Sequence, residues 1–146
     1  MKQGVDYIGV TVAILCFHPD GRLLVVHRTE KCRDEHNRWD IIGGGLDMGE
    51  EFIDAAKREA YEEVRARLDD VQLIGVRNVL RIQNDIQTHW VCVMMRGTIT
   101  NSAEIAIQEK EKFDAWKWVK LDDLPSPLHS QFMKQLEHYQ SWLKKA

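Results

Sequence analysis

The sequence of 146 residues lacks several features that would assign it to particular classes of protein. No apolar run approaches the roughly 18 residues that a membrane-spanning helix needs, and the N-terminal residues carry no signal-peptide pattern. The three cysteines, Cys16, Cys32 and Cys92, form neither a CxxC pair nor a zinc-binding spacing. We therefore expect a cytoplasmic protein without a membrane segment, whose cysteines are reduced and mostly buried.

A surplus of basic residues is also absent, because the formal net charge is −3. Proteins that bind nucleic acid polymers usually carry such a surplus, so no nucleic acid polymer is expected as a partner. A small anionic ligand stays compatible with this charge, because a bound metal and local charge can outweigh a mildly acidic total. Repeats, low-complexity tracts and flexible linkers are missing too, which favours a single domain over residues 1–146.

The pattern of apolar residues predicts a chain that mixes strands and helices. Strands are expected at 9–17, 23–27, 71–82, 89–99 and 116–121, and helices at 51–68 and 129–144. The first two strands should form a hairpin through the Asp-Gly turn at residues 18–21. Residues 43–49 are rich in glycine and predict a loop rather than a regular element. This order predicts an α/β fold in which a curved mixed sheet carries helices on both sides.

Three carboxylates in the first predicted helix point to chemistry. Glu59 lies three and four residues before Glu62 and Glu63, and these spacings bring the side chains onto neighbouring parts of one helix surface. Like charges held together repel each other, and Mg²⁺ relieves the repulsion because it prefers oxygen ligands. A solvated acidic face on an unrelated α/β domain is the alternative interpretation, since surface helices often carry runs of glutamate.

The residues before this helix favour the metal interpretation. Gly44 lies in a glycine-rich loop that enters the helix, where backbone groups and the helix dipole suit an anion. Such a loop can also turn a backbone carbonyl toward a metal. Glu50 and Arg58, eight residues apart, could pair and tie the loop to the helix.

Taken together, Gly44-x5-Glu50-x7-Arg58-Glu59-Ala60-x-Glu62-Glu63 resembles the Nudix box. Six of the seven literal positions of the family pattern are present, which makes a chance match improbable. The order of strands around the box is similar to the Nudix α/β/α sandwich. Residues 111–116 and 122–125 further resemble the C-terminal part of the MutT-like nucleoside triphosphate branch. The chain departs from the family pattern at Arg65, where the box has a glycine that usually caps the helix in a left-handed conformation, at Ile42, usually proline, and at Asp47, often glutamate.

The resemblance implies a magnesium site, with Mn²⁺ as a substitute, formed by Glu59, Glu62, Glu63 and the backbone carbonyl of Gly43. Glu59 and Glu62 are the residues assigned to catalysis, and Glu59 is either a ligand or the general base that takes a proton from water. Glu50, Arg58 and Gly44 are assigned to the structure of the box. The replacement of the box glycine by Arg65 removes no metal ligand.

Three residues outside the box are candidates with open alternatives. Glu111 matches an additional acidic ligand or base of some relatives, or is one charge in a solvated run. Arg28, at the end of a strand, could contact phosphate through its fixed fork of donors, or lie on the surface. Trp39 could stack on a base, or pack in the core.

The resemblance therefore implies a metal-dependent hydrolase of a phosphoanhydride bond in a small nucleotide. A nucleoside triphosphate, cut to monophosphate and pyrophosphate, is the expected substrate. ADP-ribose, a dinucleotide or a nucleotide sugar is the alternative, because the box holds only the shared diphosphate and metal. A non-catalytic nucleotide-binding module is a third interpretation. A homodimer is also compatible with the sequence, since the exposed ends of the long strands could pair.

Overall fold

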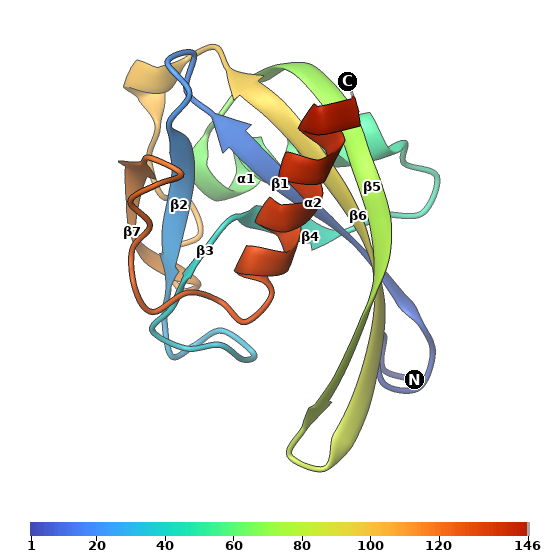
Figure 1. Cartoon of the computed structure of the whole chain (residues 1–146). Helices are drawn as coiled ribbons and strands as arrows, with labels where there is room; N and C mark the ends of the chain where they lie inside the picture. The colour runs from blue at the N-terminus through green and yellow to red at the C-terminus, as the bar shows by residue number, and fades with distance from the viewer. Residues whose placement is uncertain (146) are drawn as a thin grey trace.

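The computed structural model describes residues 1–145 and contains one seven-stranded mixed sheet between two helices (Figure 1). The predicted α/β sandwich is thus confirmed. The elements, in chain order, are β1 (Gly9–Phe17), β2 (Leu23–Arg28), β3 (Trp39–Asp40), β4 (Ile42–Gly45), α1 (Phe52–Val64), β5 (Leu68–Gln83), β6 (Ile86–Ile99), a 3-10 turn (Ser102–Glu104), β7 (Phe113–Val119) and α2 (Phe132–Lys145). No helix of residues 1–145 is long and apolar enough to cross a membrane.

Strand β1 lies at the centre of the sheet and separates two hydrophobic cores. Its side chains alternate between the two faces, as the period of a strand requires. Val12 and Ile14 pack on the side of α1, whereas Ala13 and Leu15 pack on the side of α2. Both faces of β1 are buried, which explains why its sequence is almost uniformly apolar.

The predicted hairpin of β1 and β2 pairs only at its closed end, where Phe17 lies opposite Leu23. Beyond that point the two strands take different neighbours. β1 pairs with β6 in parallel and with β4 antiparallel, while β2 pairs with β3 and β7. Because the two strands separate, the sheet opens between them, and this opening holds the cleft described below.

The glycine-rich segment is partly a strand, which corrects the prediction of a loop at residues 43–49. Gly43 and Gly44 pair with Ala13 and Val12 of β1. A Cβ atom at Gly43 would lie 2.7 Å from the carbonyl oxygen of Val12. Glycine is therefore used here for close approach of two backbones rather than for a turn.

Helix α1 ends four residues before the predicted position, because Arg65 takes the left-handed conformation with φ 61°. The Arg65 N–H donates to the Tyr61 carbonyl at 2.9 Å and the Ala66 N–H donates to the Ala60 carbonyl at 3.1 Å, as in the usual capping arrangement of a glycine. Arg65 therefore caps the helix as the box glycine would. Its side chain makes this left-handed backbone conformation less favourable than it would be for glycine.

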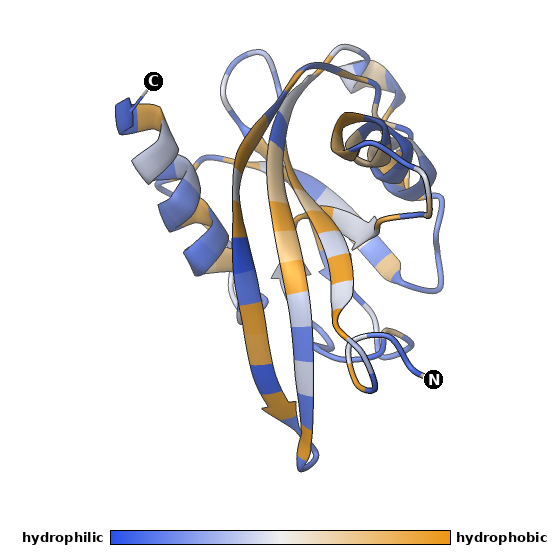
Figure 2. Cartoon of the chain, turned by 90° about the vertical axis from the view of Figure 1, so that its right-hand side faces the viewer, coloured by the Kyte–Doolittle hydropathy of each residue, from blue (hydrophilic) through white to orange (hydrophobic). Residues whose placement is uncertain are grey.

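Strands β5 and β6 form a hairpin that is longer than predicted and extends beyond the rest of the molecule (Figure 1). Asn84 and Asp85 form its turn, both with positive φ, as a tight hairpin requires. Apolar and polar bands alternate along the projecting strands (Figure 2). Helix α2 covers the other end of β5, and its Phe132, Leu136 and Tyr139 are buried.

Candidate active site

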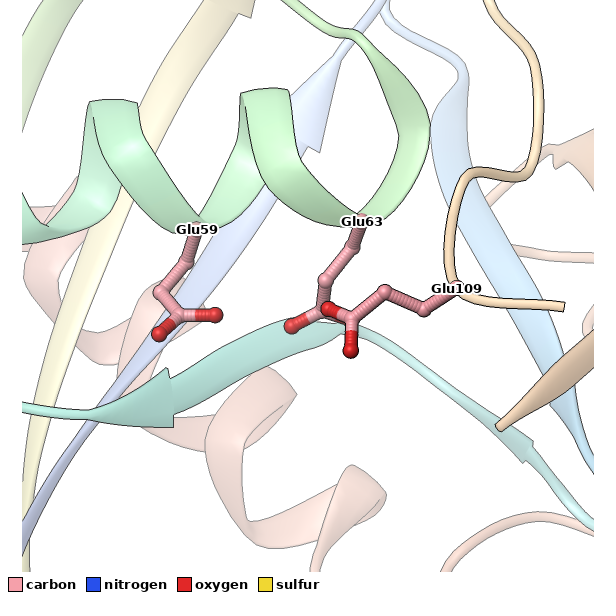
Figure 3. A group of neighbouring side chains, drawn as sticks. All are labelled: Glu59, Glu63 and Glu109. Atoms are coloured by element: carbon pink, nitrogen blue, oxygen red, sulfur yellow. The ribbon is translucent and has the colours of Figure 1, made fainter. Parts of the chain in front are cut away.

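Three carboxylates from two segments meet beside strand β4. Glu59 and Glu63 extend from α1, and Glu109 extends toward them from the loop before β7 (Figure 3). One carboxylate oxygen from each lies within 4.8 Å of the others. This spacing lets a single divalent ion contact all three groups, since such an ion is bound by oxygens at 2.0 to about 2.6 Å.

Helix geometry and one loop contact produce this cluster. Glu59 and Glu63 are four residues apart and share the face of α1 that is turned to the sheet. The backbone N–H of Gln108 donates to the carbonyl oxygen of Glu63 at 2.9 Å, and Ala106 N–H donates to Val64 at 3.1 Å. These two hydrogen bonds fasten the loop to the end of α1 and place the next residue, Glu109, beside Glu63.

Glu63 is the most unusual carboxyl of the site, because its side chain is only 1% exposed. Its Oε1 accepts a long hydrogen bond of 3.3 Å from Gly43 N–H, and its Oε2 is buried without any partner in residues 1–145. Burial raises the pKa of the Glu63 carboxyl well above its ordinary value, and the charges of Glu59 and Glu109 raise it further. An uncompensated buried acid of this kind is typical of a functional site.

The glycines of β4 make room for the carboxylates. A Cβ atom at Gly44 would lie 2.4 Å from the Glu59 carboxyl, whereas a Cβ atom at Gly45 would meet nothing within 4 Å. The N–H of Gly43 points to Glu63, and the N–H and C=O of a strand residue point to the same edge. The Gly43 carbonyl therefore faces the same side as the cluster, where the sequence predicted a backbone ligand.

Arg58 ties the glycine segment to the helix, as the sequence predicted. Its Nε and one terminal nitrogen donate to both oxygens of Glu50 at 2.7 and 2.9 Å. Hydrogen bonds from Arg58 lower the pKa of the Glu50 carboxyl. The other terminal nitrogen donates to Glu59 at 2.7 Å, so that the same guanidinium also holds one carboxyl of the cluster. Arg58 also donates a hydrogen bond of 3.0 Å to the Gly45 carbonyl oxygen, which completes the link between helix and glycine segment.

Two predicted ligands lie outside the cluster. The Glu62 side chain is 53% exposed and pairs with Arg58 at 3.2 Å, because it lies on the helix face turned to solvent. Glu111 is exposed, and its backbone carbonyl accepts a hydrogen bond from the Thr29 hydroxyl. The acidic side chain that the loop contributes is therefore Glu109, two residues earlier than predicted.

The cluster borders a cleft of about 410 Å³ that lies where β1 and β2 separate. Its lining includes Glu63 and the three glycines of β4, together with Gln135 of α2 and Gln131, which directly precedes that helix. Residues from both faces of the sheet thus contribute to a single cavity. The basic side chains along its walls are Arg28, Lys31, Arg33, Arg81 and Lys112. Its volume is in the range of sites for small molecules, which begins at about 300 Å³.

Arg28 lines this cleft, but its guanidinium is already paired. It donates to the carbonyl and the carboxylate of Asp34 and approaches Asp40 at 3.4 Å. Asp34 also accepts from Arg81 at 3.1 Å, so one carboxylate holds two arginines on the cleft wall. Trp39, the predicted stacking residue, is not among the residues that line the cleft, and its ring instead contacts His27 and the Lys117 ammonium.

Sequence reasoning missed the side chains that distant elements bring to the cleft, namely Asp34, Arg81, Trp90, Glu109, Gln131 and Gln135. Period-2 alternation along β5 does place Arg81 on the same face as Val79, and so offered a pattern that could have identified it. The position of Glu109 depends on how the loop docks on α1, for which no local pattern exists.

Comparison with known proteins agrees with this geometry. The NUDIX domain family matches residues 8–140 of the chain. An RNA pyrophosphohydrolase of Bartonella henselae is 32% identical, with 80% of this chain and 78% of that protein covered. An RNA pyrophosphohydrolase of Bartonella clarridgeiae is 33% identical, covering 79% and 78% of the two chains.

Solved structures give the same result. A MutT NUDIX hydrolase from Burkholderia pseudomallei has a TM-score of 0.79 at 28% identity, covering 91% of this chain and 98% of that one. The NUDIX domain of Shewanella oneidensis NrtR, complexed with ADP ribose, has a TM-score of 0.77 at 19% identity over 94% and 90% of the chains, and shares the fold. The family match, the relatives and the fold together establish that this chain belongs to the NUDIX family and is a Nudix hydrolase that acts on a phosphoanhydride.

Proposed function

We propose that the chain hydrolyses a nucleoside triphosphate to the monophosphate and pyrophosphate at the cluster of Glu59, Glu63 and Glu109. One observation carries the proposal. Glu63 is buried with an unpaired oxygen and faces two further carboxyls at one end of a cleft lined by basic side chains. Such an arrangement is unfavourable by itself and becomes favourable when a cation and a polyphosphate are bound.

The residues fit a magnesium ion, for which Mn²⁺ could substitute. The three carboxylates and the Gly43 carbonyl would hold the ion, which supplies neutralisation of phosphate charge and activation of water. Glu62 remains a proposed ligand on the solvent side of the metal site, since its exposed carboxyl lies on the same turn of α1 as Glu63. Glu111 remains a proposed ligand only if the loop shifts, and Glu109 replaces it in the arrangement favoured here.

The chain's own groups can perform the remaining tasks. Glu59 has one oxygen engaged by Arg58, which leaves the other oxygen for a ligand bond or for accepting a proton from water. The cationic side chains Lys31, Arg33 and Lys112 line the cleft and can compensate the charge of a polyphosphate. Lys112 already lies 3.1 Å from Glu109, so it joins the phosphate-binding wall to the carboxylate cluster.

The free nucleotide is preferred as substrate because a cleft of this volume suits one nucleotide and the chain has a net charge of −3. RNA with a 5′-triphosphate end is the second candidate. It is favoured by the curated relatives named RNA pyrophosphohydrolase. If RNA is the substrate, the expectation that no nucleic acid polymer is bound is wrong. ADP-ribose, dinucleotides and nucleotide sugars share the diphosphate and are the third.

A panel of these substrates tests the proposal. Free nucleoside triphosphates, a short RNA with a 5′-triphosphate, ADP-ribose, a dinucleotide and a nucleotide sugar would each be incubated with Mg²⁺, and with EDTA as the control. Products would be separated by chromatography. Release of pyrophosphate from free triphosphates, abolished by EDTA, is the expected result. Faster release from the RNA end than from any free nucleotide would favour the second candidate, and turnover restricted to ADP-ribose or sugar nucleotides would refute both.

A further inference from the structure

The β5–β6 hairpin carries large apolar side chains that stay exposed on the side of the sheet that α1 covers elsewhere. Val76 lies opposite Val93, which packs in the core beneath α1. Side chains of a strand alternate between its two faces, so Leu80 and Ile82 lie on the same side as Val76. These three residues are 53%, 59% and 75% exposed. Apolar bands continue along the part of the hairpin that projects from the rest of the molecule (Figure 2).

This apolar surface continues beyond the projecting strand at both ends. Leu73 of β5, together with Phe52 and Ile53 of α1, lines a shallow groove at one end. Ile8, just before β1, lies by alternation on the same side as Val10, which packs against the core beneath α1. We call this surface the hairpin face, and its exposed apolar side chains are Ile8, Phe52, Ile53, Leu73, Val76, Leu80 and Ile82.

The hairpin face is also poor in charge. No aspartate, glutamate, lysine or arginine lies on it within residues 76–82 and 87–93. The arginines of this part of β5, Arg77 and Arg81, lie on the opposite side, where each donates a hydrogen bond. Asn78 and His89, the polar neighbours of Leu80, bond to each other at 2.8 Å, so that burial would leave these groups paired. A surface depleted of charge suits the core of a protein interface better than a charged peptide or an anionic membrane.

The exposed area is large enough for a stable contact between two molecules. A side chain of this size at about half exposure presents on the order of 100 Å² of apolar surface. The hairpin face therefore presents roughly 700 Å², more than the about 300–600 Å² of the largest apolar patch on a typical monomer. Two such faces in contact would bury up to about 1,400 Å², within the range of roughly 1,200–2,000 Å² for stable, specific interfaces.

We propose that the hairpin face binds the hairpin face of a second copy of this chain, in antiparallel orientation about a two-fold axis near Asn78. The order of apolar residues along β5 favours a second copy, because it is self-complementary. Such an axis sets Ile82 of one copy against the groove at Leu73 of the other, and Val76 against Leu80. Each contact occurs twice, as in the isologous interfaces of most homodimers.

Sedimentation velocity of the whole chain over a range of concentrations tests the proposal. The expected result is a concentration-dependent species of twice the chain mass of 17.0 kDa. Leu80→Lys places a charge in the contact, and the two-fold axis repeats this substitution. The dissociation constant of the dimer should therefore rise about 100-fold or more.

Ile86→Lys is the matched control. Ile86 is 48% exposed on the same hairpin, but it pairs with Gln83, which lies on the same side of β5 as Arg81 and so on the opposite side from the hairpin face. This variant should keep the dissociation constant of the wild type. Thermal unfolding of both variants checks that each is folded.

Cross-linking tests the position of the axis without relying on a loss of binding. Asn78→Cys should give a covalent dimer in high yield with a short bismaleimide reagent, because the two introduced thiols lie close to the axis. Ile86→Cys should give no more dimer than the wild type, whose Cys32 is partly exposed.

The proposal would be overturned by a wild type that stays monomeric at every concentration, or by a dimer that Leu80→Lys leaves intact or that Ile86→Lys weakens equally. A monomeric wild type that floats with phosphatidylcholine vesicles would identify a lipid surface as the occupant and would also overturn it. These outcomes are independent of the proposed hydrolysis, because Leu80 and Ile86 are not among the residues that line the cleft.

Discussion

Replacing Glu63 by glutamine should stabilise the metal-free protein. The Glu63 side chain is buried, lies near two other carboxyls, and has one oxygen without a partner. Glutamine has nearly the same shape and no charge. Its oxygen can still accept from Gly43 N–H, and its amide can donate to a neighbouring carboxylate such as Glu59.

The size of the effect follows from what the substitution removes. A buried polar atom without a partner costs about 1–3 kcal/mol, and the repulsion from the neighbouring carboxyls adds to this. In a chain of this size, 1 kcal/mol corresponds to roughly 3 °C in the melting temperature. Glu63→Gln should therefore melt about 3–10 °C above the wild type in EDTA at pH 7.5.

The pH dependence provides a second test of the direction of this stability change. The pKa of Glu63 is raised in the folded protein, so the folded state favours the protonated acid. The contribution of this group to stability is then fully present below the unfolded pKa, about 4.3, and is lost as the pH rises through the folded pKa. The advantage of Glu63→Gln over the wild type should therefore be greatest at pH 7.5 and should shrink as the pH falls toward 5.

Excess Mg²⁺ should raise the melting temperature of the wild type above that of Glu63→Gln. A ligand present at 100 times its dissociation constant stabilises the folded state by about 2.7 kcal/mol, which the wild type should gain and Glu63→Gln should largely lack. Differential scanning fluorimetry with EDTA and with excess Mg²⁺ measures both effects. The reasoning would be refuted if Glu63→Gln melts at or below the wild type in EDTA and gains as much as the wild type from Mg²⁺.

Three further substitutions test the elements around the cluster. Gly44→Ala should lower kcat about 100-fold, because its Cβ would displace the Glu59 carboxyl. Gly45→Ala is the control and should retain the wild-type rate. Equal losses of kcat in the two variants would contradict this account. Arg65→Gly should raise the free energy of unfolding by about 0.5–1 kcal/mol in urea denaturation, because glycine tolerates the left-handed conformation; a lower value would show that the cap is not strained. Asp34→Asn should destabilise the protein by about 2–4 kcal/mol in the same assay, because partly buried arginines lose their carboxylate partner, and an unchanged value would contradict the ion-pair assignment.

The sequence predicted the α/β sandwich, its long strands and its two helices because each is encoded in a local pattern, whereas the prediction of a loop at residues 43–49 was wrong because Gly43 and Gly44 pair with β1. The apolar residues of β1 and the helical spacing of Glu59 and Glu63 are examples, and the Glu50–Arg58 pair follows from the motif itself. Helix ends were predicted less well. The conformation of Arg65 is set by the contacts of the helix end, and side-chain type alone disfavours it.

The parts of the site that the sequence did not predict depend on long-range contacts. Glu109 reaches the cluster because Gln108 bonds to the backbone of Glu63, forty-five positions earlier in the chain. Asp34 reaches Arg81 only because the loop after β2 folds against the β5–β6 hairpin. Neither arrangement follows from periodicity, because each is decided by packing of elements that are far apart in the sequence.

The most direct test of hydrolysis at the carboxylate cluster is the rate of pyrophosphate release at saturating Mg²⁺ for the wild type, Glu63→Gln and Glu62→Gln. Since Glu63→Gln is expected to be at least as stable as the metal-free wild type, which is itself folded, unfolding would not explain a lower rate. We predict a loss of about 100-fold or more for Glu63→Gln and a smaller loss for Glu62→Gln, whose carboxylate faces Arg58 and solvent. A wild-type rate in Glu63→Gln would contradict the assignment of the active site to this cluster.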